Sequence, residues 1–248
     1  MQQTSEAACH SSKASEMKCI RRKWLILTAF LLLPGSSAFA QNSTTEFLPE
    51  VDANFKLNSY VRFVFQAKDT REGGDPTQAE VGPSVEFYLK PLLRLKNVTV
   101  FDLDDAKSRP LVLALGYRAV VTPDKPLTNR LEPVATFHIP VTARILITDR
   151  NRADLDWQAG KFTWRYRNRL TAERRFTIKE YHPAPYVSAE LFYESQYSKI
   201  SSTNLYAGCL LPVGKHVQFD PYYEHENNTG KAPNQQVNAV GLILDLFF

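Results

Sequence analysis

Five arginines recur at every second position in two neighbouring stretches of this 248-residue chain. They are Arg150 and Arg152 in the first stretch and Arg165, Arg167 and Arg169 in the second. Residues two apart in an extended strand point to the same face, so each stretch presents a row of guanidinium groups. Guanidinium forks suit carboxylate and phosphate groups, which makes both rows candidates for contact with an anionic ligand.

Carboxylates are expected beside these rows, because like charges packed in a medium of low dielectric repel strongly. The segment 158–160 predicts a hairpin that sets the two rows side by side. The next turn is expected to bring Glu194 near Arg167 or Arg169. Glu190 is expected to lie closer to Glu173 and Arg175. The predicted charge network consists of Arg150, Arg152, Arg165, Arg167, Arg169, Glu173, Glu190 and Glu194.

Two roles stay open for this network. Paired charges are an ordinary filling for the interior of a small barrel, whose width side chains can occupy. The second role is contact with an anionic or phosphate-bearing ligand.

Catalysis is a weaker alternative. An acyl hydrolase or acyltransferase that acts on lipid needs a hydroxyl nucleophile activated by a base, usually histidine. His138, His182, His216 and His225 do not stand in a recognisable serine and histidine motif. No metal-binding or cofactor motif is present either, so the sequence predicts no catalytic residue, metal or cofactor. A lipid-modifying enzyme remains the alternative function.

The elements that must position the arginines are strands. Apolar and polar residues alternate along most of the chain after residue 46, and no helical period competes with that alternation. We expect strands at 47–57, 61–68, 79–90, 93–101, 111–121, 127–139, 141–157, 161–178, 185–195, 203–211, 216–226 and 236–248. The alternation at 93–101 is the least regular. The pattern predicts an all-β protein, an antiparallel up-and-down barrel of about twelve strands.

An even number of strands is typical of bacterial single-chain barrels. Twelve strands would place both ends of the barrel segment on the same side of the membrane. Ten strands remain possible if the first hairpin does not span.

The chain ends in an apolar strand. Its outward parity is predicted to consist of Val240, Leu242, Leu244, Leu246 and Phe248. The terminal residues of most domains are polar and loosely held, so this ending indicates that the terminus is built into the structure. The opposite parity carries only one charge, Asp245.

The first forty residues predict a leader. A basic start is followed by an apolar run at 24–33, and Ala38 and Ala40 are small residues at the two positions that a signal peptidase reads. The apolar run is about ten residues long, whereas a spanning helix needs roughly 20. We therefore expect residues 1–40 to be a cleaved signal peptide, with Met17 as a possible true start, and residues 41–248 to be the barrel.

Composition limits the partners. The leader holds five of the 30 basic and two of the 26 acidic residues, so the remaining chain has a net charge of about +1. Nucleic acid is therefore not a predicted partner. Of the three cysteines, only Cys209 lies beyond the leader, and no intramolecular disulfide is predicted for the mature chain.

The charge pattern favours a membrane barrel over a soluble, lipocalin-like periplasmic barrel. A soluble barrel turns its apolar parity inward, whereas an outer-membrane barrel turns it to lipid and keeps charge inside. The charged parity here is long and two-signed, and many strands reach the roughly 9 to 11 residues that a tilted span needs. An aromatic girdle at headgroup level is predicted from Trp157, Trp164, Tyr166, Tyr186 and Tyr193.

Several motifs carry a resemblance to a known family. They lie at 47–52, 73–78, 149–152, 164–170 and 221–248, and the repeated Arg-Asn-Arg element is the most specific of them. The chain resembles a family of small Gram-negative outer-membrane barrels classed as a domain of unknown function. The resemblance implies a barrel fold and an outer-membrane location. Outer-membrane lipid and lipopolysaccharide are the expected partners of such a barrel. The terminal phenylalanine resembles the signal read by the outer-membrane assembly machinery. The family supplies no established activity, so a closed or narrow-pore, porin-like barrel is the leading expectation.

Overall fold

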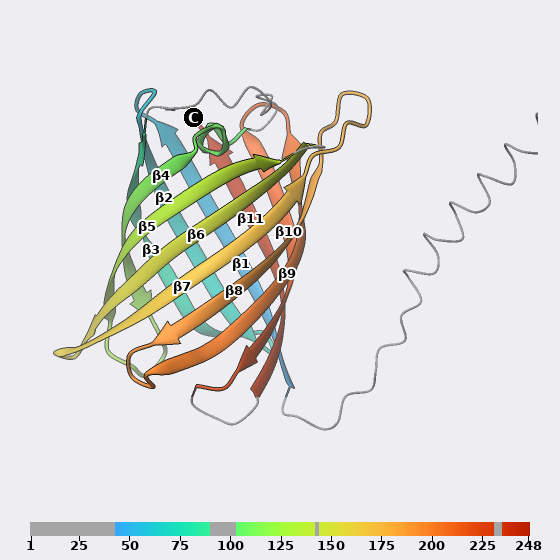
Figure 1. Ribbon diagram of the computed structural model, residues 1–248. Helices are drawn as coiled ribbons and strands as arrows, with labels where there is room; N and C mark the ends of the chain where they lie inside the picture. The colour runs from blue at the N-terminus through green and yellow to red at the C-terminus, as the bar shows by residue number, and fades with distance from the viewer. Residues whose placement is uncertain (1–42, 90–102, 142–143, 231–234) are drawn as a thin grey trace, which may run out of the picture. The chain divides into compact units, whose positions relative to one another are not determined.

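The structure, a computed structural model, describes residues 43–89, 103–141, 144–230 and 235–248. The chain divides into two units, Met1–Ala40 and Gln41–Phe248, and the second is a closed β-barrel (Figure 1). The predicted leader, with Ala38 and Ala40, lies outside the described residues. No helix in the described part of the chain is long and apolar enough to span a membrane.

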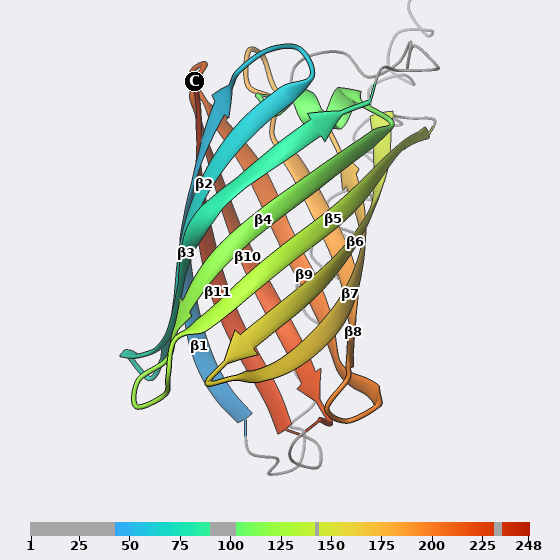
Figure 2. The same ribbon diagram turned by 90° about the vertical axis from the view of Figure 1, so that its left-hand side faces the viewer.

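Eleven strands and one short 3-10 helix make up the described barrel. The elements are β1 (Ser43–Lys56), β2 (Val61–Glu72), β3 (Asp75–Tyr88), η1 (Asp105–Ser108), β4 (Leu111–Val121), β5 (Thr128–Val141), β6 (Ile145–Gln158), β7 (Lys161–Arg174), β8 (Ala184–Glu194), β9 (Lys199–Val213), β10 (Val217–Asn228) and β11 (Gln235–Phe247). Consecutive strands pair antiparallel and tilt around the barrel (Figure 2). The predicted all-β barrel is confirmed.

The ring closes through a parallel pair. Strand β1 runs alongside β11 from Ser43 opposite Gln236 to Asn54 opposite Phe247. An odd number of strands makes the first and last strands run in the same direction, so the barrel segment begins at one end and finishes at the other. The expectation that both ends lie on the same side is therefore wrong.

The strand number also differs from the predicted twelve. In the described structure β3 pairs directly with β4, so the ring closes without a strand between them. The residues assigned to that additional strand, 93–101, lie outside the described residues. The ten-strand alternative is wrong as well, because both β1 and β2 are part of the ring.

The apolar side chains of this barrel lie on its outer face and the polar ones on its inner face, the reverse of a soluble barrel. In β8, Val187 and Leu191 point outward and are 60% and 47% exposed, whereas Ser188 and Glu190 between them are buried. Large apolar side chains cover the outer surface around the whole ring. The interior holds only small apolar clusters, one of them formed by Leu48, Tyr206, Tyr222 and Ala239. The fold therefore has an apolar exterior and a polar interior.

The last strand follows the predicted parity. Val240, Leu242 and Phe248 are exposed on the outer surface, and Leu244 and Leu246 are half-buried. The inward parity is occupied by small or apolar residues and by Asp245, which line the cavity.

The aromatic residues divide between the two faces. Trp157, Trp164 and Tyr166 are exposed on the outer face, and Trp164 stacks against Tyr193 with ring centroids 5.6 Å apart. Tyr186, predicted with them, instead lines the interior cavity. The alternation of β8 explains this difference, because Tyr186 shares its parity with the inward Ser188 and Glu190.

Candidate functional site: a charged lumen

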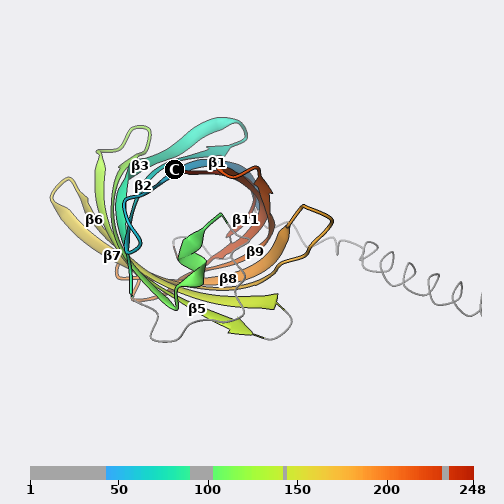
Figure 3. The ribbon, with the colours of Figure 1, turned by 90° about the horizontal axis from the view of Figure 1, so that it is seen from above.

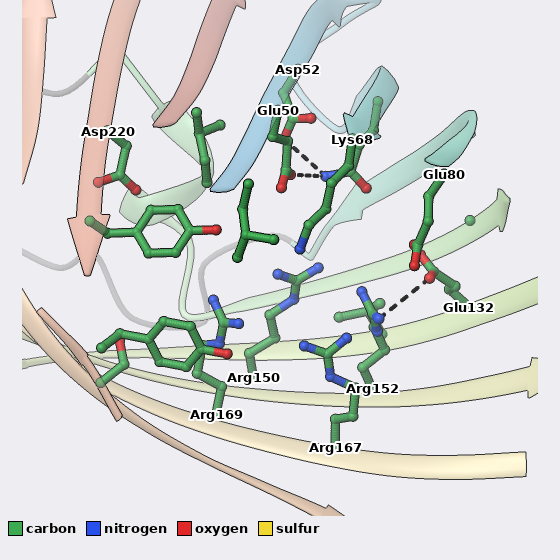
Figure 4. Close-up of a pocket in the computed structure, with 18 of the residues that line it drawn as sticks. Glu50, Asp52, Lys68, Glu80, Glu132, Arg150, Arg152, Arg167, Arg169 and Asp220 are labelled. Atoms are coloured by element: carbon green, nitrogen blue, oxygen red, sulfur yellow. Dashed lines mark hydrogen bonds and ion pairs between the residues drawn. The ribbon is translucent and has the colours of Figure 1, made fainter. Parts of the chain in front are cut away.

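The barrel encloses a cavity of about 750 Å³ that is lined by side chains from all eleven strands and from η1. Many of the residues that line it are charged, and Figure 4 shows a row of arginines on one side and a group of carboxylates with Lys68 on the other. An arginine wall lies on β6 and β7, an acidic wall lies on β1, β10 and β11, and η1 lines one end of the cavity.

The arginine wall consists of the five arginines that the sequence places at every second position: Arg150, Arg152, Arg165, Arg167 and Arg169. A two-residue turn joins β6 to β7, with Ala159 at φ 49° and Gly160 at φ 77°. Such turns match the twist of paired strands and fix their register. The register sets Arg150 opposite Arg169 and Arg152 opposite Arg167. All five side chains line the same cavity.

Asp154 neutralises one end of this wall. Its side chain is 0% exposed. Arg152 Nε lies 2.6 Å from its Oδ1, and Arg165 Nη2 lies 2.7 Å from its Oδ2. Asp154 was not included in the predicted network, although it shares the inward parity of Arg150 and Arg152.

Glu190 neutralises the other end. Arg167 and Arg169 each donate to this carboxylate at 2.8 Å, and the hydroxyl of Tyr206 donates to it at 2.8 Å as well. The guanidinium of Arg169 also lies 4.2 Å above the Tyr206 ring. Four contacts among Arg167, Arg169, Tyr206 and Glu190 therefore fix this part of the wall.

The register between β7 and β8 differs from the expected one. Glu190 pairs opposite Arg169, and Glu194 pairs opposite Arg165. The expectation that Glu194 lies near Arg167 or Arg169 is therefore wrong, because Glu190 occupies that place. The connection between the strands contains a local bridge, Ile178 to Tyr181, that shortens the effective turn and shifts the pairing. Glu194 accepts a hydrogen bond from Ser201 Oγ at 2.8 Å.

The acidic wall faces the arginine wall across the cavity. It consists of Glu46, Glu50, Asp52, Asp220, Glu224, Glu226 and Asp245. Figure 4 shows Glu50, Asp52 and Asp220 on one side of the cavity and Arg150, Arg167 and Arg169 on the other. Within the described residues, none of the seven carboxylates takes part in an ion pair.

Neutral donors contact the acidic wall instead. Tyr186 donates to Asp220 at 3.0 Å, and Gln218 donates to Asp245 at 3.2 Å. Gln66 donates to Asp52 at 3.3 Å. Because these donors are neutral, they supply no counterion to the acidic wall.

Helix η1 covers one end of the lumen (Figure 3). Just before it, Asp104 accepts from Arg62 of β2 at 2.6 Å. On the far side of the opening, Lys107 lies 2.7 Å from Glu173 of β7. Ala106 is buried against Tyr88 of β3 and Val112 of β4. Glu173 of the predicted network is therefore bound to η1 rather than to the arginine wall.

The histidines are engaged in structural contacts. The Nδ1 atoms of His138 and His216 lie 2.7 Å from the carbonyl oxygens of Arg109 and Phe247. His225 Nδ1 lies 2.9 Å from the side-chain oxygen of Asn238. None of these three contacts involves a serine or threonine hydroxyl. The described residues also contain no group of three histidine, cysteine, aspartate or glutamate side chains that could hold a metal ion.

The class of protein defined by this fold is a closed β-barrel with a polar, charged lumen. The chain matches the family described as protein of unknown function (DUF2490) over residues 47–237, and it belongs to that family. The matched range includes the arginine wall and η1. The recognition of an uncharacterised barrel family from the sequence is therefore confirmed.

The other comparisons add little. No curated protein matches the chain. Among solved structures, it is similar to a bacterial polysaccharide outer membrane secretin, with 8% sequence identity and a TM-score of 0.48. That alignment covers 73% of this chain and 62% of the secretin chain.

Proposed function

We propose that this protein is an outer-membrane β-barrel of a Gram-negative bacterium, and that its lumen is a narrow passage for small polar solutes. The observation that carries the proposal is the inverted polarity of the barrel. An apolar outer surface of this extent suits lipid, and a closed ring leaves no unpaired strand edge in the bilayer. A soluble, lipocalin-like barrel needs an apolar interior, whereas this lumen is lined by opposed charges.

The remaining parts of the chain fit this location. Residues 1–40 serve as a signal peptide that is cleaved after Ala40. The outward side chains of β11, together with Phe248 directly after it, are the feature that the outer-membrane assembly machinery binds. The exposed apolar surface contacts membrane lipid and lipopolysaccharide.

The detergent-extracted protein should migrate differently on a gel before and after boiling, as stable membrane barrels do. The same mobility before and after boiling would contradict a stable membrane barrel.

Conduction is the direct test of a passage. We expect the purified protein to form small, discrete conductance steps in planar lipid bilayers. Incubation with labelled phospholipid or lipopolysaccharide should release no acyl chain. Acyl release without conductance would instead favour the lipid-modifying enzyme.

Helix η1 is expected to restrict the passage. Asp104→Asn combined with Lys107→Gln should raise the single-channel conductance severalfold, because the two changes remove the ion pairs that tie this segment to Arg62 and Glu173. The measurement is single-channel recording of variant and unaltered protein in the same lipid.

A matched control removes a charge at an exposed turn. Lys215→Gln alters the β9–β10 turn without touching η1, and it should leave conductance unchanged. If the double variant conducts like the control, η1 does not restrict the passage.

A further inference from the structure

One member of the arginine wall differs from the other four. Arg152 and Arg165 pair with Asp154, and Arg167 and Arg169 pair with Glu190. The filling of the lumen by paired charges therefore accounts for those four. Within the described residues, the side chain of Arg150 has no hydrogen bond and no ion pair.

Arg150 is also accessible. Although it lies in the middle of β6, its side chain is exposed, because it projects into the lumen rather than into packed side chains (Figure 4). An arginine carries five N–H donors in a fixed planar fork. In Arg150 this fork faces the cavity.

The surroundings of Arg150 are electropositive. Its register partner is Arg169, and its next inward neighbour along β6 is Arg152. The wall has five arginines, and the carboxylates that pair with them are Asp154, Glu190 and Glu132, the last shared with Arg118 at 3.6 Å. The four paired arginines are held by their carboxylate partners, and three of them also lie over aromatic rings, so they are not free to turn away and relieve the repulsion. An anion at Arg150 would relieve it.

A second cation points into the same cavity from the other side of the barrel. Lys68 of β2 lines the cavity and has no ion pair among the described residues. Figure 4 shows its amino group directed into the space toward which Arg150 extends. Lysine contributes a point charge, whereas the arginine fork supplies two parallel donors.

We infer that Arg150 anchors a binding site for a phosphate-sized oxyanion inside the lumen, with Lys68 as its second cation. The occupant is a soluble solute that carries one such group. The carboxylates of the acidic wall repel anions, so the oxyanion is held between Arg150 and Lys68 and away from those carboxylates. The same wall disfavours polyanions and suits a solute whose remaining part is uncharged or cationic. This inference rests on the proposed function, because it requires a water-accessible lumen.

The test uses the full barrel in detergent and inorganic phosphate as the probe. Isothermal titration should give saturable binding with one phosphate per chain in a chloride buffer of constant ionic strength. Arg150→Gln should weaken the affinity by about tenfold or more, as expected for the loss of charge-assisted hydrogen bonds. Arg150→Lys keeps the charge but loses the fork, and it should give an intermediate affinity.

The matched control has the same change in net charge. Lys125→Gln removes a cation that also lines the cavity, in the β4–β5 turn, and it should bind phosphate like the unaltered protein. Boiling-dependent gel mobility establishes that each variant is folded. If Arg150→Gln and Lys125→Gln lost affinity equally, phosphate binding would depend on overall charge, and this result would overturn the proposed site at Arg150. Absence of saturable binding in the unaltered protein would overturn it as well.

Two further results separate the possible failures. Vesicles that contain phosphatidylglycerol should not compete with phosphate; competition would overturn a soluble occupant in favour of a lipid headgroup. Conductance without Arg150-dependent binding would contradict this site and leave the passage intact. Arg150-dependent binding without conductance would contradict the passage and leave the site intact.

Discussion

Asp154→Asn should lower the free energy of unfolding of the barrel by about 3–5 kcal/mol, the usual cost of removing one partner from a buried ion pair. The carboxylate is fully buried between Arg152 at 2.6 Å and Arg165 at 2.7 Å. Asparagine has almost the same shape but no charge, so Arg165 would lose its counterion and Arg152 would keep only Glu132, at 3.5 Å, without any change in packing volume. Urea titration of the protein in lipid vesicles measures the difference.

The control for this change is Asp124→Asn. Asp124 is exposed in the β4–β5 turn, where its backbone has φ 58°. Asparagine also tolerates this left-handed conformation, so the unfolding free energy should change by less than about 0.5 kcal/mol. Equal stability of both variants would contradict the role of Asp154 as the counterion of the wall.

Gly82→Ala should destabilise the barrel by about 2–4 kcal/mol, because backbone atoms occupy the space that a methyl group needs. A Cβ at this position would lie 2.1 Å from the carbonyl oxygen of Tyr117. The guanidinium of Arg118 donates to the carbonyl oxygens of Gly82, Pro83 and Tyr117 at the same place, each at 3.0 Å. Separation of β3 from β4 would therefore also disturb these charge-assisted hydrogen bonds.

Gly116→Ala is the matched control, since it adds the same methyl group to the same strand pair. Its Cβ would meet only side-chain atoms, Ser84 Cβ at 3.3 Å and two atoms of Glu132 at 3.5 Å. Those side chains can shift by a few tenths of an ångström. Urea unfolding should therefore show a clearly smaller loss than in Gly82→Ala, and the opposite order would contradict the close backbone approach.

The arginine wall was predictable because its geometry is local. The period of two places Arg150 and Arg152 on one face, and a two-residue turn sets them beside β7. The identity of the unpaired arginine was not predictable. It depends on the register of β8, which decides that Glu190 rather than Glu194 reaches Arg169. A nine-residue connection with its own bridge sets that register.

The acidic wall depends on contacts between the two ends of the barrel segment. Parallel closure sets Asp52 directly opposite Asp245, and β10 adds Asp220 from the next strand. An even-numbered barrel would have paired the first and last strands antiparallel, so the sequence pattern alone could not predict this juxtaposition. The same limit applies to η1, whose ion pairs with Arg62 and Glu173 join segments that are distant in the sequence.

The central claim is that the apolar face of the barrel meets lipid and the charged face meets water. Neighbouring residues on β8 test it: Val187 is 60% exposed on the outside, and Ser188 lines the cavity. Each would be replaced by cysteine and spin-labelled in a background without native cysteines, then reconstituted in lipid vesicles. Collision rates with oxygen, which concentrates in lipid, and with a water-soluble nickel chelate are the measurement.

The label at Val187 should collide with oxygen and be protected from the nickel chelate, whereas the label at Ser188 should show the reverse. A label at Val187 that is freely accessible to the nickel chelate would contradict the account, because the outer face would then be in water.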